Sequence, residues 1–208
     1  MREGDSARGR RGEAAGLTRA GLLARSVVAG GGLTAGGILV GGLSLPADSQ
    51  PSAAQDERVL EWLLEVEQLQ AAFYTEAERR GALRGELREL ATLVGEQERA
   101  HVERLERELG RSGGKRPTFD FGDATGDRDR FLAAAMDLEE LGLAAVNGQV
   151  PNLTTGRIIM AMSIASVEAR HVGWIRDLAG RNPAPRPADT PATQAQTRAA
   201  IRDTGFTE

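Results

Sequence analysis

The stretch "SVEARHVGWI", Ser166–Ile175, places a glutamate three residues before one of the two histidines in this chain of 208 residues. The other histidine lies in "EQERAHVERL", Glu96–Leu105, and it also follows a glutamate by three residues. In an α-helix, residues three apart lie on one face, so each Glu-x-x-His pair can reach a single centre. The repeated motif therefore predicts two helices that direct carboxylates and imidazoles toward a metal site.

Apolar residues around these motifs recur with the helical period of 3.6 in four blocks, and no part of the body alternates as a strand would. Asp127 is placed to N-cap the third block, and glycine or proline follows each block. The predicted helices run from about Asp56 to Arg80, from about Gly85 to Leu109, from Asp127 to about Gly148, and from "QVPNLTT" to about Ala179, with a short helix near 194–202 in the Pro-rich tail.

Short first and third connections predict two antiparallel helical hairpins. The middle connection, residues 110–126, can reach over about 50 Å when extended, whereas a 25-residue helix is about 38 Å long. We therefore expect an all-α, ferritin-like four-helix bundle with a long crossover between helices two and three. Phe119 and Phe121 are expected to anchor that crossover.

The neighbours of each glutamate at helical offsets predict which carboxylates face the core. Glu98 and Glu168 have apolar residues four and seven positions before and after them, and the same test selects Glu67 in the first helix and Glu139 in the third, with Glu140 as a weaker alternative. A buried carboxylate needs a partner, and a divalent cation suits this ligand set. The predicted metal ligands are Glu67, Glu98, His101, Glu139, Glu168 and His171.

Four carboxylates would neutralise two divalent ions, each imidazole would supply one nitrogen, and iron fits best, with manganese as the alternative. A metal-free bundle stays open as the other interpretation, in which these glutamates pair with the histidines or with arginine and some carboxyl groups keep a proton. Tyr74 lies two turns from Glu67 on the same face. Its hydroxyl either hydrogen-bonds a ligand or metal-bound oxygen, or belongs to an ordinary core tyrosine.

The body of the chain resembles the ferritin-like domain family that includes the plant desiccation-related proteins and many exported bacterial relatives. The resemblance rests on "VEQLQAAFYTEA", "GEQERAHVERL", "PTFDF", "AAAMDLEELGLAAVNG" and "SIASVEARHVGWIRDLAG", which together span nearly all of residues 56–180. It implies ligand roles for the same six residues. The chain departs from the family pattern at Gln70, often acidic in such proteins, and at Val146, often tyrosine.

Composition excludes several other classes of protein. There are no cysteines, which removes zinc ribbons, iron–sulfur clusters and thiol catalysis. The formal net charge of −4 and the small number of aromatic residues argue against a nucleic-acid partner.

Residues 1–54 differ from the rest of the chain. A basic segment precedes the uncharged, glycine-rich residues 26–47, and small residues follow near Ala54. This order is typical of a cleaved signal peptide, with a retained membrane anchor as the alternative. Arg10 and Arg11 leave the export route open between the Sec and twin-arginine pathways. We expect an exported protein with a ferritin-like domain at 55–181 and a Pro-rich extension at 182–208.

Two functions stay open from the sequence. The first is a dinuclear iron or manganese protein that reacts with dioxygen or peroxide, as an oxidase, a ferroxidase or a peroxidase-like enzyme. The second is a structural or stress-protective helical bundle in which the metal site is vestigial or serves stability only. Either is compatible with a homo-oligomer.

Overall fold

The computed structural model describes residues 39–40, 43–44, 51–111 and 117–207. The chain divides into two units, Met1–Gln50 and Pro51–Glu208. In the first unit, β1 (Leu39–Val40) pairs antiparallel with β2 (Leu43–Ser44). The predicted signal peptide or anchor falls mostly outside the described residues. Among those that are described, no helix is both long enough and apolar enough to cross a membrane.

The second unit is helical, as predicted. Its elements are α2 (Ala53–Arg80), α3 (Glu86–Glu108), the 3₁₀ turn η2 (Gly122–Thr125), α4 (Arg128–Gln149), the 3₁₀ turn η3 (Val150–Asn152), α5 (Thr155–Leu178) and α6 (Gln194–Thr204).

Capping explains where these helices begin and end. Ser52 accepts a hydrogen bond from the backbone N–H of Gln55, so α2 begins upstream of the predicted Asp56. Gly81 ends α2 with a left-handed φ of 59°, which glycine adopts without strain. Asp127 caps α4 as predicted, accepting from the first backbone N–H groups of that helix.

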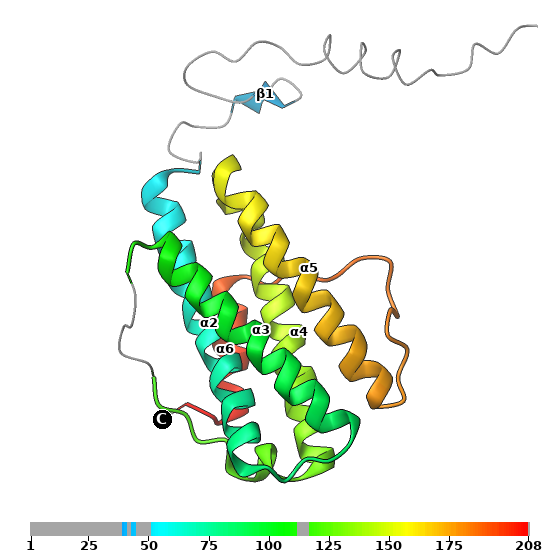
Figure 1. Cartoon of the computed structure of the whole chain (residues 1–208). Coiled ribbons are helices and arrows are strands. Elements are labelled where there is room, and N and C mark those ends of the chain that lie inside the picture. Colours follow the sequence, from blue (N-terminus) through cyan, green and yellow to red (C-terminus); the bar gives the residue numbers. More distant parts are fainter. Residues whose placement is uncertain (1–38, 41–42, 45–50, 112–116, 208) are drawn as a thin grey trace, which may run out of the picture. The chain divides into compact units, whose positions relative to one another are not determined.

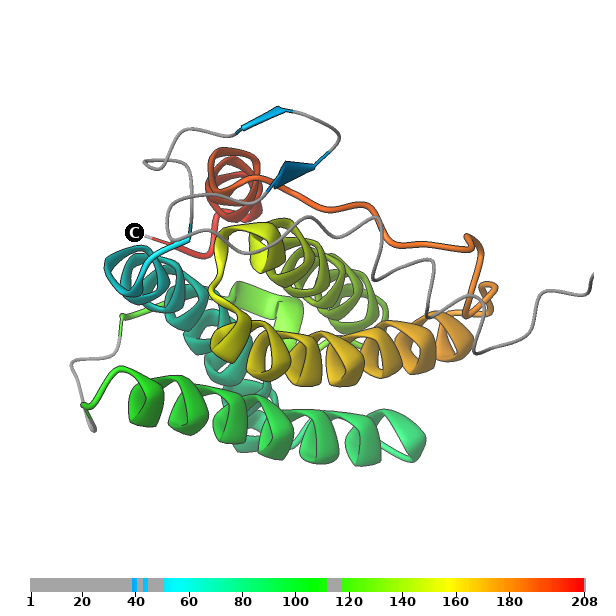
Figure 2. The same cartoon turned by 90° about the horizontal axis from the view of Figure 1, so that it is seen from above.

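The helices α2 and α3 form one antiparallel pair, and α4 and α5 form another, while α3 and α4 run in the same direction (Figure 1). Seen from above, α6 lies along α4 on the side away from α3 (Figure 2). Arg198 of α6 also pairs with Glu65 of α2 at 3.1 Å. The parallel direction of α3 and α4 is the one that a long crossover between them would give, and the crossover itself stays a prediction.

Aromatic packing fixes the position of residues 119–121, which precede α4. Phe121 is buried, and its ring lies 5.4 Å from that of Phe73 in α2 and 5.2 Å from that of Phe206 beyond α6. The backbone N–H of Asp120 also donates to the carbonyl of Phe206 at 3.0 Å. Residues 120–121, before α4, and Phe206, after α6, thus stabilise each other's position.

Two apolar clusters fill the bundle, one toward each end. One contains Leu63 of α2 and Val102 of α3, and the other contains Phe73 of α2 and Val94 of α3. Glu98 lies between Val94 and Val102 in the sequence of α3 and is fully buried. The buried carboxylate of Glu98 therefore lies in a polar layer between two hydrophobic cores.

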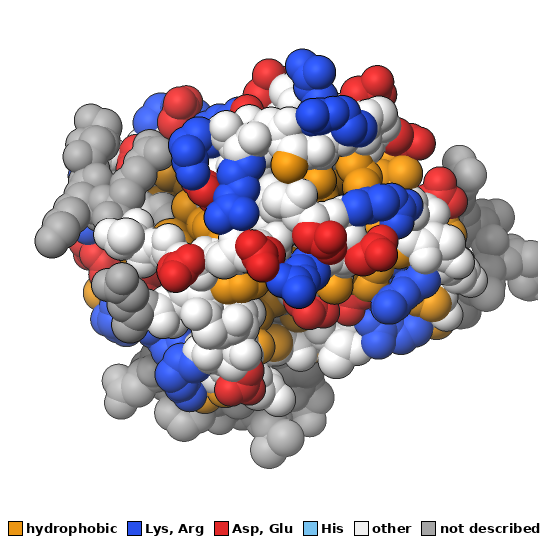
Figure 3. All heavy atoms as spheres, turned by 90° about the horizontal axis from the view of Figure 1, so that it is seen from below, with side chains coloured by type: hydrophobic (Ala, Val, Ile, Leu, Met, Phe, Trp, Pro, Cys, Tyr) orange, Lys and Arg blue, Asp and Glu red, His pale blue; other side chains and the backbone are white. Residues whose placement is uncertain are grey.

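Charges of both signs cover the outside of the molecule. On the face in Figure 3, arginine side chains lie among aspartate and glutamate side chains. Ion pairs at the surface of the described residues include Arg99 with Glu78 at 2.9 Å and Arg79 with Glu76 at 2.6 Å. Such exposed pairs contribute little to stability, about 1 kcal/mol or less each, so the folding free energy comes mainly from the two cores.

Candidate metal centre

All six predicted ligands converge on the layer between the two cores. Each of the four helices α2–α5 contributes a glutamate, and α3 and α5 each add the histidine one turn later. The side chains are almost completely buried: Glu67, Glu98, Glu139 and Glu168 are 0% exposed, His171 is 4% exposed and His101 is 8% exposed. Four helices thus bring together carboxylates that are far apart in the sequence.

The weaker alternative, Glu140, is not part of this group. Its carboxylate accepts from Arg176 Nε at 3.0 Å and is partly exposed. Glu139 and Glu140 are neighbours in the sequence, but the helical rotation of about 100° per residue directs them to different sides. Glu139 therefore lies in the buried cluster and Glu140 does not, and the ligand role of Glu139 stays a prediction.

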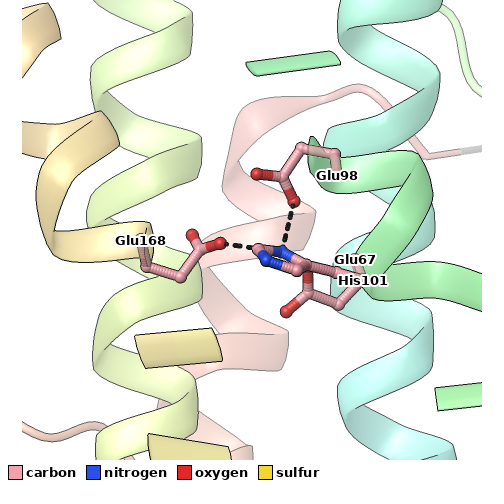
Figure 4. Close-up of side chains that lie close together, drawn as sticks. All are labelled: Glu67, Glu98, His101 and Glu168. Carbon is pink, nitrogen blue, oxygen red and sulfur yellow. Dashed lines mark hydrogen bonds and ion pairs between the residues drawn. The ribbon is translucent and has the colours of Figure 1, made fainter. Parts of the chain in front are cut away.

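Three carboxylates surround Nδ1 of His101 (Figure 4). Glu67 Oε2 lies 3.2 Å from that nitrogen, Glu168 Oε1 lies 3.2 Å from it, and Glu98 Oε2 lies 3.5 Å from it. An imidazole nitrogen carries at most one hydrogen, so it cannot donate a good hydrogen bond to three acceptors. The geometry is that of ligands around a common centre.

A matching arrangement surrounds His171. Its Nδ1 lies 2.9 Å from Glu139 Oε2, 3.0 Å from Glu98 Oε1 and 3.9 Å from Glu168 Oε1. Its other nitrogen, Nε2, lies 2.7 Å from the amide oxygen of Gln97. Because an amide oxygen only accepts, this contact places the hydrogen on Nε2 and leaves the Nδ1 lone pair of a neutral ring free for a metal.

These contacts define two overlapping groups of four ligands. One consists of Glu67, Glu98, His101 and Glu168, and the other of Glu98, Glu139, Glu168 and His171. Within each group, one ligand atom from every residue lies within 4.8 Å of the others. Glu98 and Glu168 belong to both groups, so two adjacent metal positions would share two carboxylates.

Several buried oxygen atoms in this layer have no hydrogen-bond partner among the described residues. They are Glu67 Oε1, Glu139 Oε1, Glu168 Oε1 and both carboxylate oxygens of Glu98. A buried polar atom without a partner costs about 1–3 kcal/mol, and a charged one costs more. Carboxylate oxygens and imidazole nitrogens are ligands for divalent iron and manganese, so a pair of such ions fits the atoms that lack partners.

A family model described as a ferritin-like domain matches residues 55–181, more than half of the chain. The chain belongs to the ferritin-like domain family. No curated protein sequence matches it. The matched region contains all four helices of the layer and all six clustered residues, and it ends just beyond α5.

Without a bound metal, the surroundings of this ferritin-like layer favour the protonated form of its carboxyl groups. Burial raises the pKa of Glu98 and Glu168 well above the ordinary carboxyl value, and the charge of Glu139 raises both further. Burial alone would lower the pKa of His101, but the carboxylates of Glu168 and Glu67 beside the ring raise it far above its usual range. Metal binding would therefore release protons.

Two further residues of α2 border the ferritin-like site. Gln70 is fully buried, and its amide Nε2 donates to Glu168 Oε2 at 3.2 Å. Tyr74 is also fully buried, and its hydroxyl has no hydrogen-bond partner among the described residues. Burial and the charges of Glu139 and Glu98 raise the pKa of Tyr74 well above its usual value, so it stays protonated beside the carboxylates.

Sequence reasoning missed Gln97 and the hydrogen bond made by Gln70. Gln97 precedes Glu98 directly, in a segment crowded with charged side chains, and nothing in its spacing distinguishes it from a surface residue. Its contact with His171 exists only because α5 lies beside α3. For Gln70, the sequence showed only a departure from the family pattern. The structure shows that its side chain contacts Glu168.

Proposed function

We propose that the chain is an exported ferritin-like protein that binds two divalent ions, iron or manganese, through six residues. The sharing of Glu98 and Glu168 between two ligand groups carries this proposal. Four carboxylates balance the charge of two divalent ions, so the completed site is electrically neutral. In this assignment Glu67 and His101 would hold one ion, Glu139 and His171 would hold the other, and Glu98 and Glu168 would be shared between them.

A bound pair of iron or manganese ions would supply electron-transfer chemistry toward dioxygen or peroxide. The residues of the chain supply the surroundings for it. The two apolar clusters exclude water from the layer, and Gln97 orients the ring of His171. The Tyr74 hydroxyl is a buried donor next to Glu139, which places it to hydrogen-bond a ligand oxygen. Oxidase, ferroxidase and peroxidase-like activities are all compatible with this arrangement.

Metal content tests the proposal. The full chain, produced in medium rich in iron and manganese, is expected to contain two ions per chain. Glu139→Gln should lose at least one of them, because it removes a ligand from inside the layer. Glu140→Gln is the matched control on the same helix and should keep both, because Glu140 pairs with Arg176 instead. A metal content near zero in the unmodified chain would overturn the proposal.

The burial of the site favours a second candidate, a structural or stress-protective bundle in which the metal serves stability only. The four glutamates are 0% exposed, and the most exposed ligand, His101, is only 8% exposed. Replacing His101 and His171 together by alanine separates the two functions. A large loss of thermal stability without loss of oxidase or peroxidase turnover would support the structural function, and loss of turnover would support the redox one.

Export and relationship to the desiccation-related proteins belong to the same proposal. The proposal also takes α2–α5 as a four-helix bundle with a crossover and residues 182–208 as an extension.

The support for export is the order of basic, uncharged and small residues in 1–54, and the support for the relationship is the resemblance of the helical motifs. N-terminal sequencing of the mature protein tests export: a new terminus near Ala54 indicates cleavage, and an intact terminus in the membrane fraction indicates an anchor.

A further inference from the structure

The two shared carboxylates of the metal centre are not equivalent. Glu98 presents different oxygens to the two histidines: Oε2 lies 3.5 Å from His101 Nδ1, and Oε1 lies 3.0 Å from His171 Nδ1. Glu168 presents the same oxygen, Oε1, to both, at 3.2 Å from His101 and 3.9 Å from His171. The layer is therefore asymmetric, although each of α3 and α5 contributes one Glu-x-x-His motif.

The second carboxylate oxygen of Glu168, Oε2, accepts a hydrogen bond from Gln70. The amide nitrogen of Gln70 donates to Glu168 Oε2 at 3.2 Å, and both side chains are 0% exposed. Gln70 follows Glu67 by three residues on α2, so it lies on the same helical face, one turn along. Glu98 has no such donor, and neither of its oxygens has a hydrogen-bond partner among the described residues.

Gly142 of α4 makes this hydrogen bond sterically feasible. A Cβ at position 142 would lie 2.6 Å from Gln70 Nε2 and 2.8 Å from Gln70 Oε1, closer than non-bonded atoms approach. The amide group would have to move away from its present position. Gly142 thus leaves the space in which the Gln70 amide can donate to Glu168 Oε2.

We propose that Gln70 is a positioning residue: its amide holds Glu168 Oε2, so that Glu168 would have only Oε1 free for the two ions, whereas both oxygens of Glu98 would be available to them. This inference rests on the proposed dinuclear site. A carboxylate that used one oxygen for both ions would hold them closer together than one that used both oxygens, so Gln70 would shorten the metal–metal separation. As an amide, it does so without adding a fifth negative charge to a site that four carboxylates already balance.

The test compares manganese-loaded full-length variants by metal content, by affinity for the second ion and by metal–metal distance from X-ray absorption. Gln70→Leu removes the donor at nearly constant volume, and we expect two ions, a longer metal–metal distance and roughly 10–100-fold weaker binding of the second ion. Gly142→Ala should shift both quantities in the same direction while Gln70 itself is retained. It therefore tests the inference even if Gln70→Leu does not fold.

Matched controls exist for both substitutions. Gln68→Leu makes the same change on α2 at a half-buried position outside the layer, and Gly156→Ala adds a Cβ that meets no atom within 4 Å. Both should leave the distance and the affinity unchanged. Two ions in the unmodified chain, with the same distance and affinity in Gln70→Leu and Gly142→Ala, would overturn this inference alone. Fewer than two ions in the unmodified chain would overturn the proposed function.

Discussion

His171 of α5 and Gln97 of α3 are joined by a contact of 2.7 Å between the imidazole Nε2 and the amide Oε1. This contact links the two helices that carry the Glu-x-x-His motifs. It also fixes which nitrogen of His171 is available to a metal, in the way that outer hydrogen bonds orient histidine ligands generally.

Replacement of Gln97 by leucine should weaken the metal position that includes His171. The ring would lose the acceptor that holds its Nε2 hydrogen, and we expect roughly a 10–100-fold loss of affinity for one of the two ions. Titration with manganese measures both binding steps. Gln97→Glu keeps an acceptor at the same place and should retain tight binding. Equal affinities in the leucine variant and the unmodified chain would show that Gln97 does not orient the ligand.

Metal should stabilise the protein more at higher pH. Because burial raises the pKa of Glu98 and Glu168, the metal-free folded chain binds more protons than the unfolded chain above the ordinary carboxyl pKa. Its free energy of unfolding therefore falls as pH rises through that range. Metal takes the place of those protons.

The difference in Tm between the manganese-loaded and metal-free protein should consequently widen from about pH 5 to about pH 7. Thermal unfolding of both forms across this range measures it. The Glu98→Gln variant serves as a control, because its metal-free form should lose less stability as pH rises. A difference in Tm that stays constant or narrows would contradict the account.

Asp56, on α2, should stabilise the start of α5. It is buried on α2 and accepts from the backbone N–H of Thr154 at 2.9 Å and from the Thr154 hydroxyl at 2.5 Å. Asp56→Ala should lower the free energy of unfolding by about 1–2 kcal/mol, as loss of a helix cap does. Chemical denaturation measures this, with the exposed neighbour Glu57→Ala as the control. Equal losses in the two variants would refute a specific role for Asp56.

Gly148 should be required for the C-terminal segment to pack against α4. The backbone N–H of Ala192 donates to the carbonyl of Ala144 at 2.9 Å, and a Cβ at Gly148 would overlap the carbonyl oxygen of Ala192. Gly148→Ala should therefore displace the segment, at a cost of about 1–3 kcal/mol, and expose residues 182–208 to protease. Gly156→Ala is the control. Unchanged proteolysis in Gly148→Ala would show that the segment packs differently.

The fold and the six clustered residues were predictable because they depend on local patterns. Helical periodicity and apolar neighbours separated Glu139 from Glu140, and caps such as Asp127 and Gly81 marked helix ends. The family match agrees with the ferritin-like fold. The ligand roles of the six residues, and the signal or anchor in 1–54, stay predictions.

Contacts between helices were not predictable in the same way. The first helix was expected to begin at about Asp56, but Ser52 is its N-cap, and Asp56 instead accepts hydrogen bonds from Thr154, the N-cap residue of α5. The contacts of Gln97 with His171 and of Gln70 with Glu168 depend on how α2, α3 and α5 are rotated about their axes. Spacing within one helix predicts which face points to the core, but not which side chain of a neighbouring helix each residue meets.

Anomalous scattering at the manganese and iron absorption edges, from crystals of the metal-loaded protein, tests the central claim most directly. The account predicts two peaks in the layer between the two cores. One should lie among Glu67, His101 and the shared carboxylates, and the other among Glu139, His171 and the same carboxylates. A single peak, or no peak while the six side chains keep their present contacts, would contradict a dinuclear metal centre.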